Sequence, residues 1–390
     1  MKPVLTVASL AAFVALAAPA RADFASCVAS LRSDASAKGV SDKTIAAAFD
    51  KLQPDPKVLD FETNQPEFKT PIWDYMAGLV DDERVADGKA AMAREASALA
   101  KAEARFGVDK HVLAAIWGVE SNFGENTGGR PLVQSLATLA CQSEVRPAYY
   151  RGELMATLKI ADRGDIPLDK LNGSWAGAFG QTQFMPSTFL RLAVDLDGSG
   201  RDIVDNPAAA LGSTANYLAK SGWRTGEPWG FEVKLPDGYA GPSGRKAKAP
   251  MSSWAARGIK RIDGKPLGDG DAGLLLPAGP QGPAFLVTKN FDVIYSYNAA
   301  ESYTLAIAIL AQRLAGGLGI VTPWPTDDPG LSRAERRELQ ALLAKHGYDV
   351  GAPDGAIGAK TKSAIADFQG KNGLTVDGRA SVKVLEALRR

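Results

Sequence analysis

The sequence is poor in the residues that build metal and nucleic-acid sites. Its 390 residues include only 2 His and 2 Cys, too few for a zinc site of three or four nitrogen and sulfur ligands. The 45 Lys and Arg are balanced by 44 Asp and Glu, whereas binding nucleic-acid phosphates requires a strongly basic face. Zinc and nucleic acid are therefore excluded. The remaining composition, 45% hydrophobic and 23% charged, is that of a globular protein with two or three domains.

Long apolar runs are also absent, except at the start of the chain. Residues 4–18 are almost entirely apolar, and Ala-Arg-Ala at 20–22 is a small-x-small cleavage site. The run is shorter than the roughly 20 residues of a membrane-spanning helix, so it predicts a signal peptide, residues 1–22, and a periplasmic protein without a stable membrane span. An uncleaved anchor is one alternative. A lipoprotein signal that ends at Cys27 is weaker, because charged residues interrupt the approach to it.

The two cysteines, Cys27 and Cys141, would lie in an oxidising compartment after export. Two cysteines in such a compartment more often pair than stay free. We therefore expect a disulfide that ties the mature N-terminus to a point far along the chain. Two buried thiols are the alternative.

Residues 23–320 change character along their length. The pattern is mostly helical to about residue 217, with Gly-rich turns in its second half. Glycine and proline become dense between about 223 and 293, where short runs at 231–235 and 285–287 predict strands. A helical pattern then returns. We predict a mainly helical α+β domain with a small β-rich insertion at about 223–293.

A separate small module follows a proline-rich segment. Residues 321–330 predict a stiff, extended linker. Residues 331–390 hold 11 Lys and Arg against 7 Asp and Glu, whereas residues 23–330 hold 32 and 37. The balanced total therefore conceals an acidic body and a basic tail, which supports a domain boundary at the linker.

One carboxylate occupies a position where the helical pattern calls for an apolar residue. Residues 112–119 predict a helix with Leu113, Ile116 and Trp117 on one stripe, and the same spacing leads to Glu120. Burial raises the pKa of a carboxyl group, as a general acid near neutral pH requires. On this pattern alone, a buried glutamate that is satisfied by a hydrogen bond or an ion pair is an equal alternative.

A later segment, residues 173–186, combines small residues with Ser, Gln and aromatic side chains. Such a stretch lets the backbone approach a ligand closely and offers hydroxyl and amide groups to a polar polymer such as a sugar chain. Small residues also permit close helix packing, so the segment is weak evidence alone. Together with Glu120 it is strong evidence for a ligand site.

Four stretches resemble the lytic murein transglycosylase B family, in the same order along the chain. They are residues 66–75, 117–124 (Trp-Gly-Val-Glu-Ser-Asn-Phe-Gly), 173–186 and 290–298 followed by Tyr303, within a resemblance that covers about residues 24–320. It implies a lysozyme-like catalytic domain that cleaves the β-1,4 bond between N-acetylmuramic acid and N-acetylglucosamine in peptidoglycan. The acid/base residue that it implies is Glu120. The implied sugar-cleft residues are Ser174, Gln183, Tyr297, Asn298 and Tyr303.

The resemblance also implies a mechanism in which one carboxylate acts twice. Most glycosidases need two carboxylates. A lytic transglycosylase instead uses the muramyl C6 hydroxyl as the attacking group and forms a 1,6-anhydro ring, which benefits from the high effective molarity of an intramolecular reaction. No motif marks a second carboxylate, although spacing does not exclude Glu125, Glu144 and Glu301. A hydrolytic muramidase is the nearest alternative, and a non-catalytic peptidoglycan-binding scaffold is the alternative of another class.

A loop resembles the first half of an EF-hand. Asp195, Asp197 and Ser199 place side-chain oxygens at positions 1, 3 and 5, a glycine is at position 6, and the carbonyl of Arg201 is at position 7. Position 12 is Asn206 instead of the bidentate glutamate, and Asp202 and Asp205 are alternative ligands. A structural calcium ion and a metal-free turn therefore both remain open, and catalysis itself is expected to require no cofactor.

The tail module resembles the small three-helix peptidoglycan-binding domain of many cell-wall enzymes. The resemblance covers most of residues 331–390 and rests on pairs such as Asp354-Gly355, Phe368-Gln369 and Asp377-Gly378. It implies that the tail binds peptidoglycan strands and tethers the enzyme to them. A stabilising helical appendage is the alternative. Proteins of cell-wall synthesis or remodelling are candidate partners.

Overall fold

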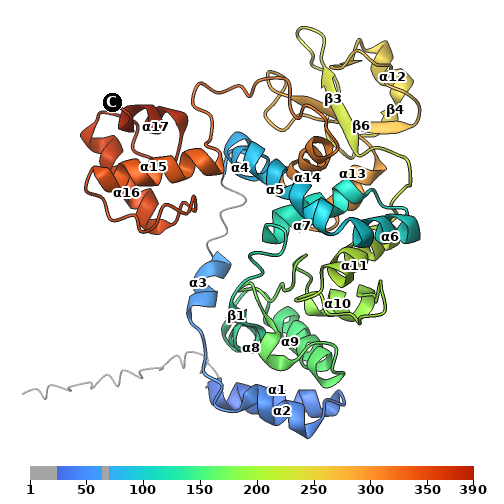
Figure 1. The fold of residues 1–390 in the computed structure, drawn as a ribbon, viewed down its shortest axis with the longest axis vertical. Helices are drawn as coiled ribbons and strands as arrows, with labels where there is room; N and C mark the ends of the chain where they lie inside the picture. The colour runs from blue at the N-terminus through green and yellow to red at the C-terminus, as the bar shows by residue number, and fades with distance from the viewer. Residues whose placement is uncertain (1–23, 64–69) are drawn as a thin grey trace, which may run out of the picture.

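Residues 24–63 and 70–390 are described by a computed structural model (Figure 1). The predicted signal peptide lies outside these residues, as does part of the 66–75 stretch. The described chain is mainly helical with a small sheet, as the sequence predicted. In these residues, no helix combines the length and the apolar character that a membrane span requires.

A first hydrophobic core joins the N-terminal helices to the middle of the chain. Its main helices are α1 (Phe24–Ala37), α2 (Asp42–Phe49), α3 (Lys57–Thr63), α8 (Leu132–Gln142), α9 (Pro147–Asp162) and α10 (Pro186–Leu192). Ser41 caps α2 by accepting a hydrogen bond from the Thr44 backbone N–H, as serine does at helix starts. Cys27 of α1 and Cys141 of α8 form a disulfide with a Cα–Cα distance of 5.9 Å. The N-terminal helices are thus attached to α8 both covalently and by apolar packing.

The second and larger core surrounds α7 (Lys110–Ser121), which is buried along almost its whole length. The helices that pack around it are α4 (Ile72–Leu79), α5 (Asp82–Arg94), α6 (Ala96–Phe106), α11 (Pro207–Lys220), α13 (Lys289–Tyr295) and α14 (Glu301–Leu314). A two-stranded antiparallel ribbon pairs β1 (Arg130–Pro131), which follows α7, with β2 (Asn172–Gly173), which follows α9 and a short 3-10 helix (Leu168–Lys170). The predicted apolar stripe of α7 faces this core.

The β-rich insertion is a five-stranded antiparallel sheet with the order β4-β6-β7-β3-β5. Its strands are β3 (Gly230–Lys234), β4 (Ala249–Pro250), β5 (Lys260–Arg261), β6 (Asp271–Leu275) and β7 (Ala284–Val287), and α12 (Met251–Ala256) packs beside them. The runs predicted as strands at 231–235 and 285–287 correspond to β3 and β7, which pair with Phe231 opposite Leu286. Buried Glu232 of β3 accepts backbone hydrogen bonds of 2.7 Å from Val321 and Thr322. The sheet therefore holds the first residues of the linker.

The tail consists of three helices, as the resemblance implied: α15 (Arg333–Lys345), α16 (Ala359–Lys371) and α17 (Val382–Leu388). Ser332 and Glu335 form a capping box at the start of α15. Two buried glutamines hold the loops between the helices. Gln340 accepts from the Gly355 N–H at 2.7 Å, and Gln369 accepts from the Gly378 N–H at 2.9 Å. The Asp-Gly pairs of the sequence are therefore loop anchors.

The tail lies against α4 and α5 (Figure 1), and ion pairs cover the contact. Arg333 of α15 contacts Asp81 at 3.1 Å and Asp87 at 2.9 Å, and Arg337 contacts Glu83 at 2.7 Å. The charge difference between body and tail thus has a structural counterpart: basic residues of the tail face acidic residues of the body. The tail is therefore docked on the body, a contact that the predicted stiff linker did not indicate.

Candidate active site

Glu120 lies in the last turn of α7, where the backbone reverses sharply. The next residues, Asn122, Phe123 and Gly124, all have positive φ angles of 51°, 59° and 90°. The reversal turns the Phe123 ring back against the helix, edge-on to Trp117, with 5.7 Å between ring centroids. Only glycine fits at position 118, because an added Cβ would lie 2.5 Å from the Phe123 ring. The turn leaves Glu120 half-buried, whereas the helical pattern had placed it in the core.

Hydrogen bonds from the 173–186 stretch fix this end of α7. Ser121 Oγ donates to the Gln181 backbone oxygen at 2.5 Å and accepts from the Gly124 N–H at 2.9 Å. The Trp117 indole N–H donates to Gln181 Oε1 at 3.0 Å. Buried polar groups that are fully bonded rigidify their surroundings. Gln181 therefore positions the Glu120 turn, a role that sequence reasoning did not assign to it.

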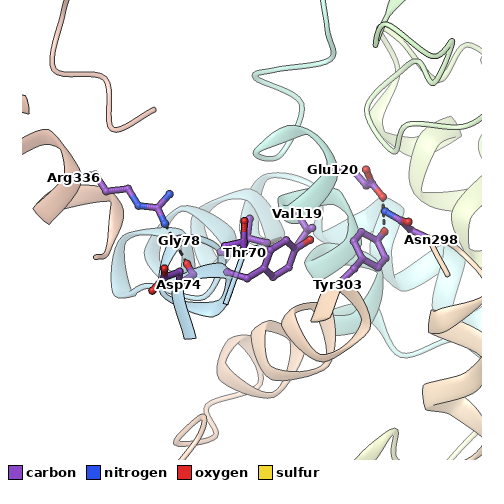
Figure 2. Close-up of a pocket in the computed structure, with 10 residues that line it drawn as sticks. Thr70, Asp74, Gly78, Val119, Glu120, Asn298, Tyr303 and Arg336 are labelled. Carbon is purple, nitrogen blue, oxygen red and sulfur yellow. Dashed lines mark hydrogen bonds between the residues drawn. The ribbon is translucent and has the colours of Figure 1, made fainter. Parts of the chain in front are cut away.

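Glu120 faces a pocket of about 380 Å³ (Figure 2). The residues that line it come from α4, α7, the start of α14 and the tail: Thr70, Asp74, Tyr75, Gly78, Leu79, Val119, Glu120, Asn298, Tyr303 and Arg336. Figure 2 shows Asn298 and Tyr303 turned toward Glu120 at one end, and Asp74, Gly78 and Arg336 at the other. The pocket therefore extends from the carboxyl group to the face on which the tail docks.

Two tyrosines set the electrostatics around Glu120. The Tyr303 hydroxyl donates a hydrogen bond to Glu120 Oε1, and the Tyr297 hydroxyl donates to the Thr182 carbonyl at 2.7 Å. Burial, and then the nearby Glu120 charge, raise the pKa of both tyrosines well above the ordinary value. Both phenols therefore stay protonated at neutral pH, and Tyr303 remains a hydrogen-bond donor to the carboxylate.

The structure brings some of the predicted sugar-cleft residues together and not others. Asn298 and Tyr303 share the pocket with Glu120, and Tyr297 lies close enough to sense its charge. Ser174 and Gln183 are not among the residues that line this pocket. Ser174 Oγ accepts from the Ala178 N–H at 3.0 Å within a turn. The Gln183 amide donates to the carbonyls of Thr127 and Gly180 at 2.9 and 2.8 Å.

The sequence left three carboxylates open as a second catalytic group, and none of them lines the pocket. Glu125 accepts from the Asn122 amide at 2.5 Å, Glu301 lies 3.4 Å from Arg245, and Glu144 is exposed. Among the residues that the structure describes, Asp74 is the carboxylate that lines the pocket together with Glu120. Both of its oxygens accept hydrogen bonds from Arg379 of the tail, so Asp74 is committed to an ion pair.

The EF-hand-like loop offers an incomplete set of metal ligands. Asp195 Oδ1 accepts from the Gly198 N–H at 2.7 Å, and Asp197 Oδ1 accepts from Ser199 Oγ at 2.5 Å. Hydrogen bonds from the Ser199 hydroxyl and backbone N–H lower the pKa of Asp197. The Arg201 side chain turns away to Asp165 at 2.6 Å. No group of three or more His, Cys, Asp or Glu in the described residues is arranged to hold a metal ion.

The chain matches known families over most of its length. Residues 23–312 match the transglycosylase SLT domain, and residues 332–388 match the putative peptidoglycan binding domain. The chain belongs to the SLT transglycosylase family. It is therefore an enzyme of the lytic transglycosylase type, and the resemblance stated from its motifs is confirmed.

Individual relatives agree with the family. This chain is 44% identical to SltB3 from Pseudomonas aeruginosa, which was solved in complex with NAG-anhNAM-pentapeptide. The two structures match with a TM-score of 0.76 over 95% of this chain and 100% of SltB3. The chain is 29% identical to Escherichia coli Slt35, solved in complex with calcium, with a TM-score of 0.66 over 74% and 92% of the two chains. It is 33% identical to membrane-bound lytic murein transglycosylase B of Escherichia coli over 62% of this chain and 66% of that one. The match thus spans about two thirds of that last relative.

Proposed function

We propose that this enzyme cleaves the β-1,4 bond between N-acetylmuramic acid and N-acetylglucosamine in peptidoglycan and leaves 1,6-anhydromuramyl ends. The observation that carries the proposal is the pocket in which Glu120, at the end of a buried helix, accepts a hydrogen bond from a protonated tyrosine. The SltB3 complex with a product-like anhydro sugar and a pentapeptide supports the same chemistry in a relative.

Glu120 acts as both acid and base in this proposal. In its protonated form it donates a proton to the leaving glycosidic oxygen, while the N-acetyl group of the substrate stabilises the developing positive charge. As a carboxylate it then accepts the proton of the muramyl C6 hydroxyl, whose oxygen attacks C1 and closes the ring. The neighbouring tyrosine fixes the orientation of the carboxyl group through its hydrogen bond. The intramolecular hydroxyl outcompetes water because of its high effective molarity.

We assign the sugar contacts to the residues that the family motifs suggest. Asn298 and Tyr303 lie beside Glu120 and contact the muramyl residue in this proposal. Tyr297 supports them from the buried side, since it packs against Tyr217 with 4.9 Å between ring centroids. Ser174 also lies nearest the reacting muramyl residue in this proposal, and Gln183, on the same 173–186 segment, lines the sugar cleft. The ion-paired Asp74 is not a catalytic base.

Digestion of purified sacculi tests the reaction. Glu120→Gln is expected to reduce the release of anhydromuramyl products by about 10²–10⁴-fold, the usual contribution of general acid–base catalysis. Glu125→Gln, five residues along the chain and outside the pocket, is the matched control and should retain activity. Reducing ends among the products would indicate a hydrolytic muramidase. Binding of sacculi without release of products by the wild type would indicate a scaffold.

We also propose that the enzyme is exported to the periplasm and that residues 1–22 are removed. In the mature chain, the 321–330 linker separates the catalytic domain from the peptidoglycan-binding domain. The disulfide between Cys27 and Cys141 supports an oxidising compartment. The tail binds peptidoglycan strands and holds the enzyme on them, and proteins of wall synthesis or remodelling are candidate partners. The mass of the protein recovered from periplasm tests export: it should correspond to residues 23–390, and a chain that retains residues 1–22 would contradict cleavage.

We propose separately that the EF-hand-like loop binds a calcium ion, which has a structural role and takes no part in catalysis. The ligands would be the side chains of Asp195, Asp197 and Ser199 and the carbonyl of Arg201. Asn206 stands at position 12 in place of the bidentate glutamate, so weak binding is expected. Because Slt35 was solved in complex with calcium, calcium is the ion to titrate, with Asp197→Asn as the control variant. Absence of both binding heat and a thermal shift would remove the site.

A further inference from the structure

One side chain of the active-site pocket comes from the tail module. Arg336 lies on α15 and lines the pocket that contains Glu120 (Figure 2). Its guanidinium group extends toward Gly78 and Asp74, at the end of the pocket opposite Glu120. The tail is therefore a wall of the pocket as well as a neighbouring domain.

Arg336 differs from the other arginines of this interface in its partners. Arg333, Arg337 and Arg379 each pair with a carboxylate of the body. Arg336 donates instead to two backbone oxygens, Leu331 O at 3.0 Å and Asp74 O at 3.2 Å. The carboxylate of Asp74, the residue whose backbone oxygen Arg336 contacts, is occupied on both oxygens by Arg379. Among the described residues, Arg336 thus forms no ion pair.

The position of Arg336 is fixed, although no carboxylate of the described residues forms an ion pair with it. The guanidinium group packs on Gly78 of α4 so closely that an added Cβ there would lie 2.5 Å from Nη2. Burial lowers the pKa of Arg336, and the charges of Asp74 and Asp81 offset this only in part. An arginine stays protonated at neutral pH even then. The pocket therefore presents a rigidly held cation that favours an anionic ligand group.

We propose that Arg336 binds a carboxylate of the peptide stem of peptidoglycan and so makes the tail part of the substrate site. This inference rests on the proposed function. A glycan strand whose lactyl groups are all joined to peptides carries no carboxylate of its own, so the anionic groups of the substrate lie on the stems. Glu120 acts on the glycosidic bond at one end of the pocket, and the stem extends from the neighbouring muramyl residue toward the other. Arginine suits this role because its planar fork matches a carboxylate.

The experiment compares two synthetic tetrasaccharides of alternating NAG and NAM with pentapeptide stems. One has free stem carboxyl groups, and in the other these groups are carboxamides. The wild type should cleave the free-carboxyl substrate with a kcat/KM about tenfold or more above that of the carboxamide, the size expected for a hydrogen bond to a charged group. Arg336→Gln should lose this preference and cleave the two substrates with similar kcat/KM. Arg336→Lys should keep part of it.

Two further variants separate recognition from folding. Gly78→Ala keeps the arginine but displaces its guanidinium group, so it should reduce the preference in the same way. Arg337→Gln removes a neighbouring arginine of α15 that pairs with Glu83, and it should keep the wild-type preference.

Equal losses on both substrates in Arg336→Gln, or a wild type that does not distinguish them, would overturn the proposal. If the wild type cleaves neither substrate, the proposed function fails. Calorimetric titration of the wild type and Arg336→Gln with NAG-NAM-pentapeptide and its carboxamide then decides the role of Arg336. Weaker binding of the free-carboxyl ligand alone to the variant supports it, and equal binding to both proteins rejects it.

Discussion

The two ends of the described chain are attached to the catalytic helices in different ways. At the N-terminal end, α1 is joined to α8 by the Cys27–Cys141 disulfide and by an apolar core. At the C-terminal end, the tail is held on α4 and α5 by ion pairs between its arginines and acidic residues of the body. The first attachment depends on oxidation and apolar burial, and the second on charge. They should therefore fail under different conditions and with different effects on catalysis.

The disulfide should give the largest change in stability. Cys27 and Cys141 are 114 residues apart, and closing a loop of about 100 residues stabilises a fold by up to about 4.7 kcal/mol in the chain-entropy model. Replacing both cysteines with serine should lower the free energy of unfolding by about 2–5 kcal/mol, measured in urea. The attachment of the tail should not change. Equal stability of the reduced and oxidised wild type would contradict this expectation.

Arg379→Ala should have the next largest effect and act on the other end of the chain. It leaves the buried carboxylate of Asp74 without its ion pair, at a cost of about 2–3 kcal/mol, since an unpaired charged group is expensive to bury. Cleavage at the linker by added protease should become faster. Arg389→Ala, which breaks an exposed pair with Glu338 inside the tail, should change neither the free energy of unfolding nor the cleavage rate measurably.

Arg333→Ala tests whether the tail influences catalysis. We expect no such influence from the N-terminal helices. Arg333 donates to Asn122 Oδ1 at 3.1 Å, and Asn122 ends the helix that carries Glu120. Loss of the hydrogen bond to Asn122, worth about 1 kcal/mol, should reduce kcat about fivefold with little change in KM. Loss of the ion pairs to Asp81 and Asp87 should in addition weaken the docking of the tail. The double cysteine variant should keep its kcat when it is folded. Identical kinetics of Arg333→Ala and wild type would show that the contact only holds the tail.

The ion pair between Arg151 of α9 and Asp34 of α1 should matter least. Arg151 lowers the pKa of Asp34 below the ordinary 3.8, so its folded-state pKa lies below the unfolded value. The pair therefore contributes stability above about pH 4, and this is lost as the pH falls through the folded-state pKa. Asp34→Asn should cost less than about 1 kcal/mol at pH 7, because the pair is partly exposed. Urea unfolding should show no difference from wild type well below pH 4.

The sequence predicted elements and motifs better than it predicted contacts. The Glu120 helix and the strands β3 and β7 follow from local periodicity and turn residues, which act within a few positions, whereas the three tail helices were implied by the resemblance. The half-buried state of Glu120 did not follow, because it depends on the reversal at Asn122–Gly124 and on the Phe123 ring. Periodicity predicts a face of a helix, but it does not show where the helix ends against its neighbours.

Arg336 is the clearest case of what local patterns miss. Nothing within α15 distinguishes it from Arg333 and Arg337, since all three are arginines of one basic helix. Its place in the pocket depends on how α15 docks on α4, some 250 residues earlier in the chain, and on the absence of a side chain at Gly78. The charge difference between body and tail predicted that the two regions differ. It did not predict that they share a pocket.

The disulfide also has a consequence for the order of folding. The ribosome makes α1 first, but its cysteine partner lies 114 residues later and its apolar partners lie on α8 and α9. The N-terminal helices therefore lack their packing partners until the chain has been made to about residue 162. Contacts between such distant residues form slowly. The earliest part of the described chain to be synthesised is thus expected to be among the last to fold. Until then, its free thiol can form disulfides with other molecules.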